Sequence, residues 1–180
     1  MQRSELEHLI RAAAALTGRT QFVICGGQAL LALGEDAPDE LMTSLTADLF
    51  VPDDARNTQL IGQSLGELSV FEQTFQICAR AVDQESVVLP EGWRDRVVAI
   101  ESADTAGACG YCLEVHDLAI SKLASDKDDD FTFVLGLLHH RLVDEGMLED
   151  RLAATDMSAR PHLRADCEGR FARLMRALTL

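Results

Sequence analysis

The chain has 180 residues, of which 47% are hydrophobic, so it can bury the core of one ordinary domain. Acidic residues outnumber basic ones by 30 to 16, and the formal net charge of −14 argues against an extended nucleic-acid-binding surface. The sequence has no apolar run of about 18 residues and no signal-peptide pattern at its start, so we expect a cytoplasmic protein without a membrane span.

Apolar periodicity and turn residues divide the first part of the chain into alternating helices and strands. Residues 4–16 repeat apolar side chains at helical spacing, with Ser4 as the expected N-cap and Gly18 as the residue that ends the helix. Clusters of β-branched and aromatic residues separated by Gly, Pro and Asp predict the later segments. In chain order they are a strand over 21–25, a helix over 28–33, a loop over 36–39, a strand over 45–51, an irregular helix over 54–67, and strands over 75–81, 96–100 and 111–115.

Beyond residue 115 the pattern is helical. We expect helices over roughly 116–125, 129–140, 144–154 and 160–178. Asp128 or Asp129 is the expected N-cap of the second of these helices, and His139 and His140 are expected to end it. Strands followed by a helical tail indicate an α+β fold, a mixed β-sheet flanked by helices with a helical C-terminal extension.

The charge is distributed unevenly along the chain. Residues 141–180 contain seven arginines and seven acidic residues, so residues 1–140 carry the whole net charge. The tail also has an apolar stripe at helical spacing. We therefore expect an α/β core over 1–140 and a helical extension over 141–180 that packs on this core. The helices of the extension are the expected surface for a protein partner or a second copy of the chain.

A glycine pair follows the first predicted strand. Gly26 and Gly27 stand between that strand and a predicted helix, so backbone N–H groups and a helix N-terminus come together there. This geometry suits a phosphate group. The pair matches neither a Walker A loop nor a GxGxxG fingerprint. The alternative is a tight strand-to-helix turn that needs glycine for packing.

A single carboxylate lies inside the second predicted strand. Carboxylates two residues apart on a strand point to the same side and can hold one Mg²⁺ ion between them. Asp48 has no such partner, because Phe50 occupies the second position. Asp53 and Asp54 follow the strand and reach this site only if the backbone bends back. The alternative for Asp48 is an ion pair or a turn cap.

A lysine and an acidic cluster follow the last predicted strand. Lys122 lies on the predicted helix over 116–125, and Asp130 comes eight residues later, after Asp126, Lys127, Asp128 and Asp129. Lysine is a common point-charge ligand of nucleotide phosphates. The alternative for Lys122 is a solvated position on an amphipathic helix.

Two of the five cysteines form a CxxC pattern. Cys109 and Cys112 lie before or within a predicted strand, and His116 follows four residues later. A redox pair should open a helix, which lowers the thiol pKa, and a zinc site needs a fourth ligand. We expect partly buried cysteines in a glycine-rich turn, with a redox or metal role as the alternative.

These segments resemble the nucleotidyltransferase superfamily. The resemblance rests on Gly26–Gly27, on Thr46-x-Asp48, and on the distal Asp-Leu-x-x-x-Lys-Leu segment followed by Asp130. It covers most of residues 20–155. Residues 89–93 and 114–122 are similar to those of an uncharacterised bacterial branch allied to AbiE-type toxins of toxin–antitoxin systems.

The resemblance implies a role for each matching residue. In active relatives the glycine pair holds the nucleotide triphosphate, two strand carboxylates hold Mg²⁺, and a downstream lysine and aspartate complete the site. Carried over, Gly26, Gly27 and Lys122 are the expected nucleotide-binding residues, Asp48 is the expected metal ligand, and Asp48, Lys122 and Asp130 are the expected catalytic residues. Phe50 departs from the pattern, so the metal site is expected to be degenerate.

Two functions are consistent with these residues. The first is an enzyme that transfers a nucleotidyl group from an NTP to RNA or to a protein hydroxyl, with Mg²⁺ as cofactor. The alternative is an inactive module of the same fold that binds a nucleotide or a protein partner. A second carboxylate near Asp48, supplied by Asp53, Glu101 or Glu114, would favour the enzyme.

Overall fold

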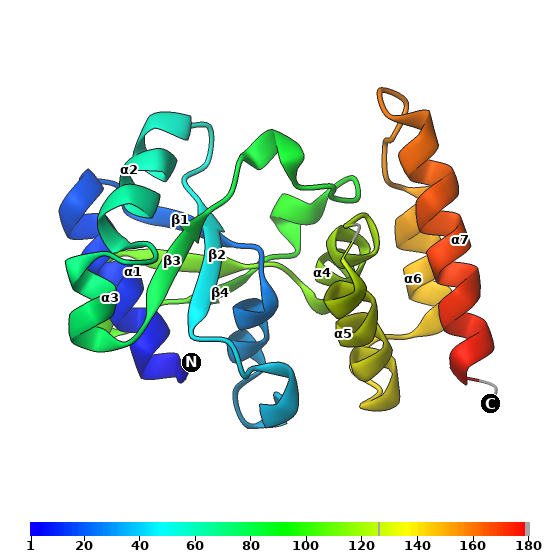
Figure 1. Cartoon of the computed structure of the whole chain (residues 1–180), viewed down its shortest axis with the longest axis horizontal. Helices are drawn as coiled ribbons and strands as arrows, with labels where there is room; N and C mark the ends of the chain where they lie inside the picture. Colours follow the sequence, from blue (N-terminus) through cyan, green and yellow to red (C-terminus); the bar gives the residue numbers. More distant parts are fainter. Residues whose placement is uncertain (126, 179–180) are drawn as a thin grey trace. The chain divides into compact units, whose positions relative to one another are not determined.

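The structure is a computed structural model of the whole chain and describes residues 1–125 and 127–178 (Figure 1). Asp126 of the predicted acidic cluster lies outside these ranges. The described residues form two compact units. Unit 1 comprises Met1–Val87 with Val97–Leu113, and unit 2 comprises Val88–Arg96 with the described part of Glu114–Leu180. The predicted division of the sequence into 1–140 and 141–180 stays a prediction.

Within the described residues, unit 1 contains a five-stranded sheet in the order β3-β2-β1-β5-β4 (Figure 1). Its β1–β5 and β2–β3 pairs are parallel, whereas β1–β2 and β4–β5 are antiparallel, so the predicted mixed sheet and α+β class are confirmed. The strands are β1 (Gln21–Ile24), β2 (Thr46–Phe50), β3 (Cys78–Ala81), β4 (Val98–Ile100) and β5 (Cys109–Cys112).

The two longest helices of unit 1 each bury apolar side chains. Helix α1 (Arg3–Thr17) buries Leu6, Leu9, Ile10 and Ala13 and packs against α2 (Ala55–Leu65), which packs along β3. The short helix α3 (Val70–Phe75) packs against α2. The 3₁₀ helix η1 (Gly27–Asp36) follows the glycine pair and contacts β2, β4 and β5. Short 3₁₀ turns occupy η2 (Asp39–Leu41), η3 (Gln84–Ser86) and η5 (Ala103–Thr105).

Unit 2 is helical, as predicted for the chain beyond residue 115. Its helices are α4 (Val115–Leu123), α5 (Asp128–His139), α6 (Glu145–Ala153) and α7 (Pro161–Leu178), together with the 3₁₀ turn η4 (Trp93–Asp95). The side chain of Asp117 on α4 is completely buried. It accepts two hydrogen bonds from Arg96, at 2.8 and 3.0 Å, and lies 3.4 Å from Arg151 of α6. These ion pairs attach the segment Val88–Arg96 to α4 and α6.

Several predicted helix ends were wrong by a few residues, each for a local reason. Gln2 rather than Ser4 is the N-cap of α1, because the Glu5 carboxylate accepts a hydrogen bond from the Gln2 N–H at 2.6 Å. Lys127 is the N-cap of α5, so Asp128 lies in its first turn instead of capping it. The predicted helix over 28–33 lies within the 3₁₀ segment η1, in which Gly34 has non-helical backbone angles (φ 65°, ψ −128°), and His140 does follow the end of α5.

Two predicted strands also have different bounds. The strand expected over 75–81 is β3, which begins later, at Cys78, because Phe75 is the last residue of α3 and Gln76 ends that helix in a left-handed conformation with φ of 60°. The strand expected over 111–115 is β5, which begins earlier at Cys109 and ends at Cys112. The Glu114 side chain caps the next helix, so the backbone turns helical at Val115. None of the helices in the described ranges is long and apolar enough to cross a bilayer.

Candidate functional site

Gly26 lies directly against Asp48, so the structure brings two of the predicted site residues together. The backbone N–H of Cys25 donates to the carbonyl oxygen of Asp48 at 2.9 Å, which extends the β1–β2 pairing to the glycine pair. A Cβ atom at position 26 would lie 2.7 Å from Asp48 Oδ2 and 2.8 Å from Asp48 Cβ. Only glycine admits this approach, which is the packing requirement anticipated as the alternative for this turn. Gly27 begins η1.

The carboxylate of Asp48 is held by an arginine of the neighbouring strand. Parallel pairing of β2 and β3 places Arg80 opposite Asp48, and the Arg80 Nη1 donates to Asp48 Oδ1 at 3.1 Å. The second guanidinium nitrogen lies 3.5 Å from Glu67. Arg80 is about half exposed, at 51% of its side-chain surface. The predicted metal ligand is therefore part of an ion pair, the alternative that the sequence left open.

The side chain of Phe50 is completely buried, so it belongs to the core of unit 1. Neither carboxylate after β2 turns back to Asp48. The backbone N–H of Asp53 donates to Gln84 Oε1, and Gln84 Nε2 donates to Asp53 Oδ1, both at 2.9 Å. Asp54 caps α2 by accepting a hydrogen bond from the Asn57 N–H. In the described ranges no group of three or more His, Cys, Asp or Glu side chains is arranged to hold a metal ion. These residues do not fit a two-carboxylate Mg²⁺ site in unit 1.

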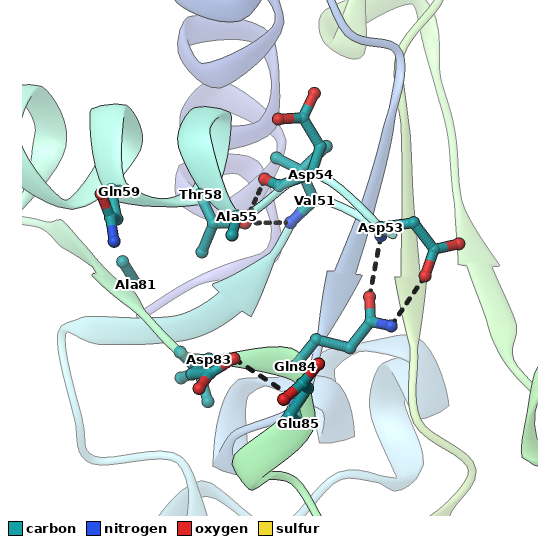
Figure 2. Close-up of a pocket in the computed structure, with 11 residues that line it drawn as sticks. Val51, Asp53, Asp54, Ala55, Thr58, Gln59, Ala81, Asp83, Gln84 and Glu85 are labelled. Carbon is teal, nitrogen blue, oxygen red and sulfur yellow. Dashed lines mark hydrogen bonds between the residues drawn. The ribbon is translucent and has the colours of Figure 1, made fainter.

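A pocket of about 550 Å³ lies beyond the carboxyl ends of the parallel strands β2 and β3. Figure 2 shows Asp53 and Gln84 pointing toward one another across it. Ligands of open α/β sheets often bind at this end of the strands. However, four carboxylates line the pocket, which disfavours a phosphate there. They belong to Asp53, Asp54, Asp83 and Glu85.

The other two predicted site residues meet in unit 2. Lys122 Nζ on α4 donates to Asp130 Oδ1 on α5 at 2.7 Å, and both side chains are largely buried. The ammonium group also lies 5.7 Å from the centroid of the Phe133 ring. The alternative reading of Lys122 as a solvated helix position is therefore wrong. Because this pair belongs to unit 2 and the Gly26–Asp48 pair to unit 1, each is described in its own unit.

A small cavity of about 140 Å³ opens beside Lys122. Lysines occur at only two positions in the sequence, and both side chains line this cavity. The other charged lining residues are Asp128 on α5 and Arg170 and Arg173 on α7. Sequence reasoning missed the two arginines because they lie more than 40 residues beyond Lys122. The available signal was the recurrence of arginine at 170, 173 and 176, at helical spacing.

Glu114, one of the candidate second carboxylates named from the sequence, caps α4 in unit 2. Its Oε2 accepts from the N–H groups of His116 and Asp117, and its Oε1 lies 2.6 Å from His116 Nδ1. The Nε2 of His116 accepts from the Asp144 N–H at 2.9 Å. Burial raises the pKa of Glu114, but the hydrogen bonds that its carboxylate accepts from His116 and Asp117 outweigh this and hold the pKa below its usual value.

A family model described as "nucleotidyltransferase of unknown function" (DUF6036) matches residues 4–166. The chain belongs to this nucleotidyltransferase family. The predicted relationship to nucleotidyltransferases is thereby confirmed, whereas the AbiE-type branch stays a prediction. No curated protein and no solved structure gave a significant match.

In this member of the family, Cys109 and Cys112 do not resemble a redox pair. Both thiols are free and buried on β5, and their spacing of three residues in a strand points them to opposite faces. Burial raises the pKa of Cys112 to about 12 and also raises the pKa of Cys109. A reactive thiol needs a lowered pKa, so the geometry favours the structural interpretation.

Proposed function

We propose that this protein is a member of the nucleotidyltransferase family that binds an NTP without Mg²⁺-dependent transfer of a nucleotidyl group. The observation that carries the proposal is the state of Asp48, which pairs with Arg80 at 3.1 Å while Phe50 is completely buried. A metal at Asp48 would have to displace a cation, and no second strand carboxylate would help to hold it.

Unit 2 supports the nucleotide-binding part of the proposal. Lys122 is one of the residues that the family resemblance assigns to the nucleotide, and Asp130 orients its ammonium group at 2.7 Å. A lysine held in this way presents a positioned charge to a phosphate. Unit 1 offers less, because it contains 15 acidic residues and five arginines, with no lysine. Binding of the nucleotide phosphates is therefore proposed for Lys122 and its surroundings.

The second candidate function is transfer of a nucleotidyl group from an NTP to RNA or to a protein hydroxyl, with Mg²⁺ at Asp48. One observation favours it. The Asp48–Arg80 pair is partly exposed, with 22% and 51% of the two side chains accessible. Such pairs contribute only about 0–1 kcal/mol, so a metal could replace the arginine at little cost.

Calorimetric titration with each NTP, with and without Mg²⁺, separates the two candidates. We expect wild-type protein and Asp48→Ala to bind an NTP in the absence of Mg²⁺. Lys122→Ala should lose this binding and Lys122→Arg should keep part of it, because Arg retains the charge. Binding that requires Mg²⁺ and disappears in Asp48→Ala would overturn the proposal in favour of the transferase. Thermal unfolding of each variant shows whether it is folded.

Partner, location and biological context also stay predictions. A protein partner or a second copy is proposed to bind the helices at the C-terminal end of the chain. A cytoplasmic location and a role like that of toxin–antitoxin proteins are proposed with it. The gel-filtration mass of the purified protein tests the second copy directly, since a dimer would double it.

A further inference from the structure

The only tryptophan in the sequence, Trp93, lines a cavity in unit 2. The cavity has a volume of about 660 Å³, within the range of about 300–1,000 Å³ that is usual for small-molecule sites. Its walls come from residues 89–95 and from Ala154 and Asp156 at the end of α6, all of which belong to unit 2. The described residues that line it do not include Lys122, the contact proposed for the nucleotide phosphates.

The segment that carries Trp93 is fixed by hydrogen bonds on both sides of it. The N–H of Glu91 donates to the carbonyl oxygen of Ala154 at 3.1 Å, which attaches the segment to the end of α6. Arg96 donates to the completely buried carboxylate of Asp117 on α4. The Arg96 N–H also donates to the Trp93 carbonyl oxygen at 3.1 Å, which closes the turn η4. A side chain on a turn fixed in this way loses little entropy when a ligand binds.

The apolar part of the lining suits a flat ring. Pro90 is buried, and Leu89 and Trp93 are half-buried. An indole ring offers a flat apolar surface, and every nucleobase can stack on such a ring because every base has a π-face. The guanidinium of Arg94 lies 5.1 Å from the centroid of the Trp93 ring, and guanidinium planes also stack on bases. These neighbours favour a planar aromatic ligand.

The charged part of the lining suits the edge of a base. It consists of the guanidinium of Arg94 and of the carboxylates of Glu91, Asp95 and Asp156. Ionised carboxylates accept hydrogen bonds from N–H groups, such as those at the edges of nucleobases, and they repel a phosphate. A cation is the other ligand that carboxylates and an indole attract. However, Arg94 already lies over the Trp93 ring and would repel it.

We infer that this cavity binds a nucleobase, with Trp93 stacked on the ring and the carboxylates of the lining accepting from its N–H groups. The base can belong to an NTP or to a free nucleoside. The inference rests on the proposed function only in that both take a nucleotide or a part of one as the ligand. Purines should bind more tightly than pyrimidines, because their larger ring covers more of the indole.

Tryptophan fluorescence of the full chain tests the inference, because all of this emission comes from Trp93. Adenosine, without Mg²⁺, should quench the emission, and ribose, which lacks the base, should not. Calorimetric titration then measures the affinity of variants without the indole. Trp93→Leu should weaken adenosine binding by about tenfold or more, the usual effect of removing one stacked aromatic ring, and Trp93→Phe should keep part of it. Phe71→Leu is the matched control. It removes a half-buried ring of unit 1 outside the lining and should change the affinity by less than about twofold.

The outcomes separate this inference from the proposed function. Adenosine binding that is lost in Trp93→Leu, without ATP binding, supports the inference and overturns the proposed function. ATP binding that is equal in wild-type protein and Trp93→Leu, with no quenching by adenosine, overturns the inference and supports the proposed function. Failure of both ligands to bind overturns both. Quenching by tetramethylammonium and not by adenosine would show a site for cations and overturn the inference.

The same titrations identify the source of the base. A gain in affinity from adenosine to ATP that disappears in Lys122→Ala supports an NTP that also uses the proposed phosphate contact. Equal affinities for adenosine and ATP support a nucleoside as the ligand of the cavity and overturn the phosphate contact at Lys122. Circular dichroism of each variant verifies the fold.

Discussion

The two units differ in the number and placement of their acidic and basic residues. Unit 1 has three times as many acidic residues as arginines, and the cation beside its predicted metal ligand is Arg80, which pairs with that ligand. Unit 2 holds both lysines and places four cations around one cavity. The residues that match the family pattern are divided between the units. Matching positions in unit 1 therefore do not imply metal chemistry there, whereas unit 2 contains Lys122, the residue proposed above to bind the nucleotide phosphates.

The two units also differ in how deeply an ion-paired aspartate is buried. Asp48 in unit 1 keeps 22% of its side chain exposed, whereas Asp117 in unit 2 is completely buried between Arg96 and Arg151. Water screens the charges of an ion pair at the surface, so such a pair contributes little to stability. A buried charge that loses its partner has no water to replace that partner. The same residue type is thus expected to matter little for stability in one unit and a great deal in the other.

Removing the buried aspartate should have the largest effect. Asp117→Ala leaves the guanidinium groups of Arg96 and Arg151 without their buried partner, so we expect a loss of about 3–5 kcal/mol in the free energy of unfolding. Urea denaturation measures it. Glu149→Ala, an exposed acid on α6, is the control and should change stability by less than about 0.5 kcal/mol. Equal effects of the two substitutions would contradict the comparison.

A methyl group at Gly26 tests how tightly the turn closes on Asp48. The added Cβ would lie 2.7 Å from Asp48 Oδ2, and overpacking of this kind costs about 1–3 kcal/mol. Thermal unfolding should show a lower midpoint for Gly26→Ala. Gly169→Ala on α7 meets no atom within 4 Å and should stabilise the helix by about 0.5–1 kcal/mol. A neutral Gly26→Ala would mean that the glycine is not required for the approach to Asp48.

Much of the fold could be predicted from local patterns. The strand–glycine–helix order, β2 with Asp48, and the four helices after residue 115 follow from periodicity and turn residues. The errors lie at the ends of helices, where a residue outside the apolar pattern decides where the helix begins or ends. Glu114 starts α4 by capping it, and Gln76 ends α3 in a left-handed conformation, neither of which apolar spacing can reveal.

The candidate site could be predicted only in part, because its charges pair over long sequence distances. The spacing of Asp48 and Lys122 along the sequence was enough to match them to residues of the family. The partner of Asp48 is Arg80, which depends on the parallel register of β2 and β3. The cations beside Lys122 come from α7, which depends on how helices pack. No local pattern specifies either contact.

Acid should weaken unit 2 through Glu114. Because hydrogen bonds from His116 and Asp117 hold its pKa below the usual value, ionised Glu114 contributes stability above about pH 4.5. That contribution is lost as the pH falls through the lowered pKa. Glu114→Gln should cost about 1 kcal/mol at pH 7, as losing a helix cap does. Its unfolding midpoint should then fall less than the wild-type midpoint between pH 5 and pH 3, and parallel curves would contradict this.

Removing Arg80, the ion-pair partner of Asp48, should have the smallest effect on stability of these substitutions. It also tests most directly whether Asp48 can bind Mg²⁺. Arg80→Gln removes a half-exposed pair, so we expect a change of about 0–1 kcal/mol, measured by urea denaturation. Phe50→Asp is a poorer probe, because it would bury a carboxylate in the core. In NTP titrations, Arg80→Gln should acquire no Mg²⁺ dependence, because a lone carboxylate is a weak site. Arg56→Gln, an exposed change on α2, is the control. Mg²⁺-dependent binding that appears only in Arg80→Gln would show that Arg80, and not Phe50, keeps the metal out.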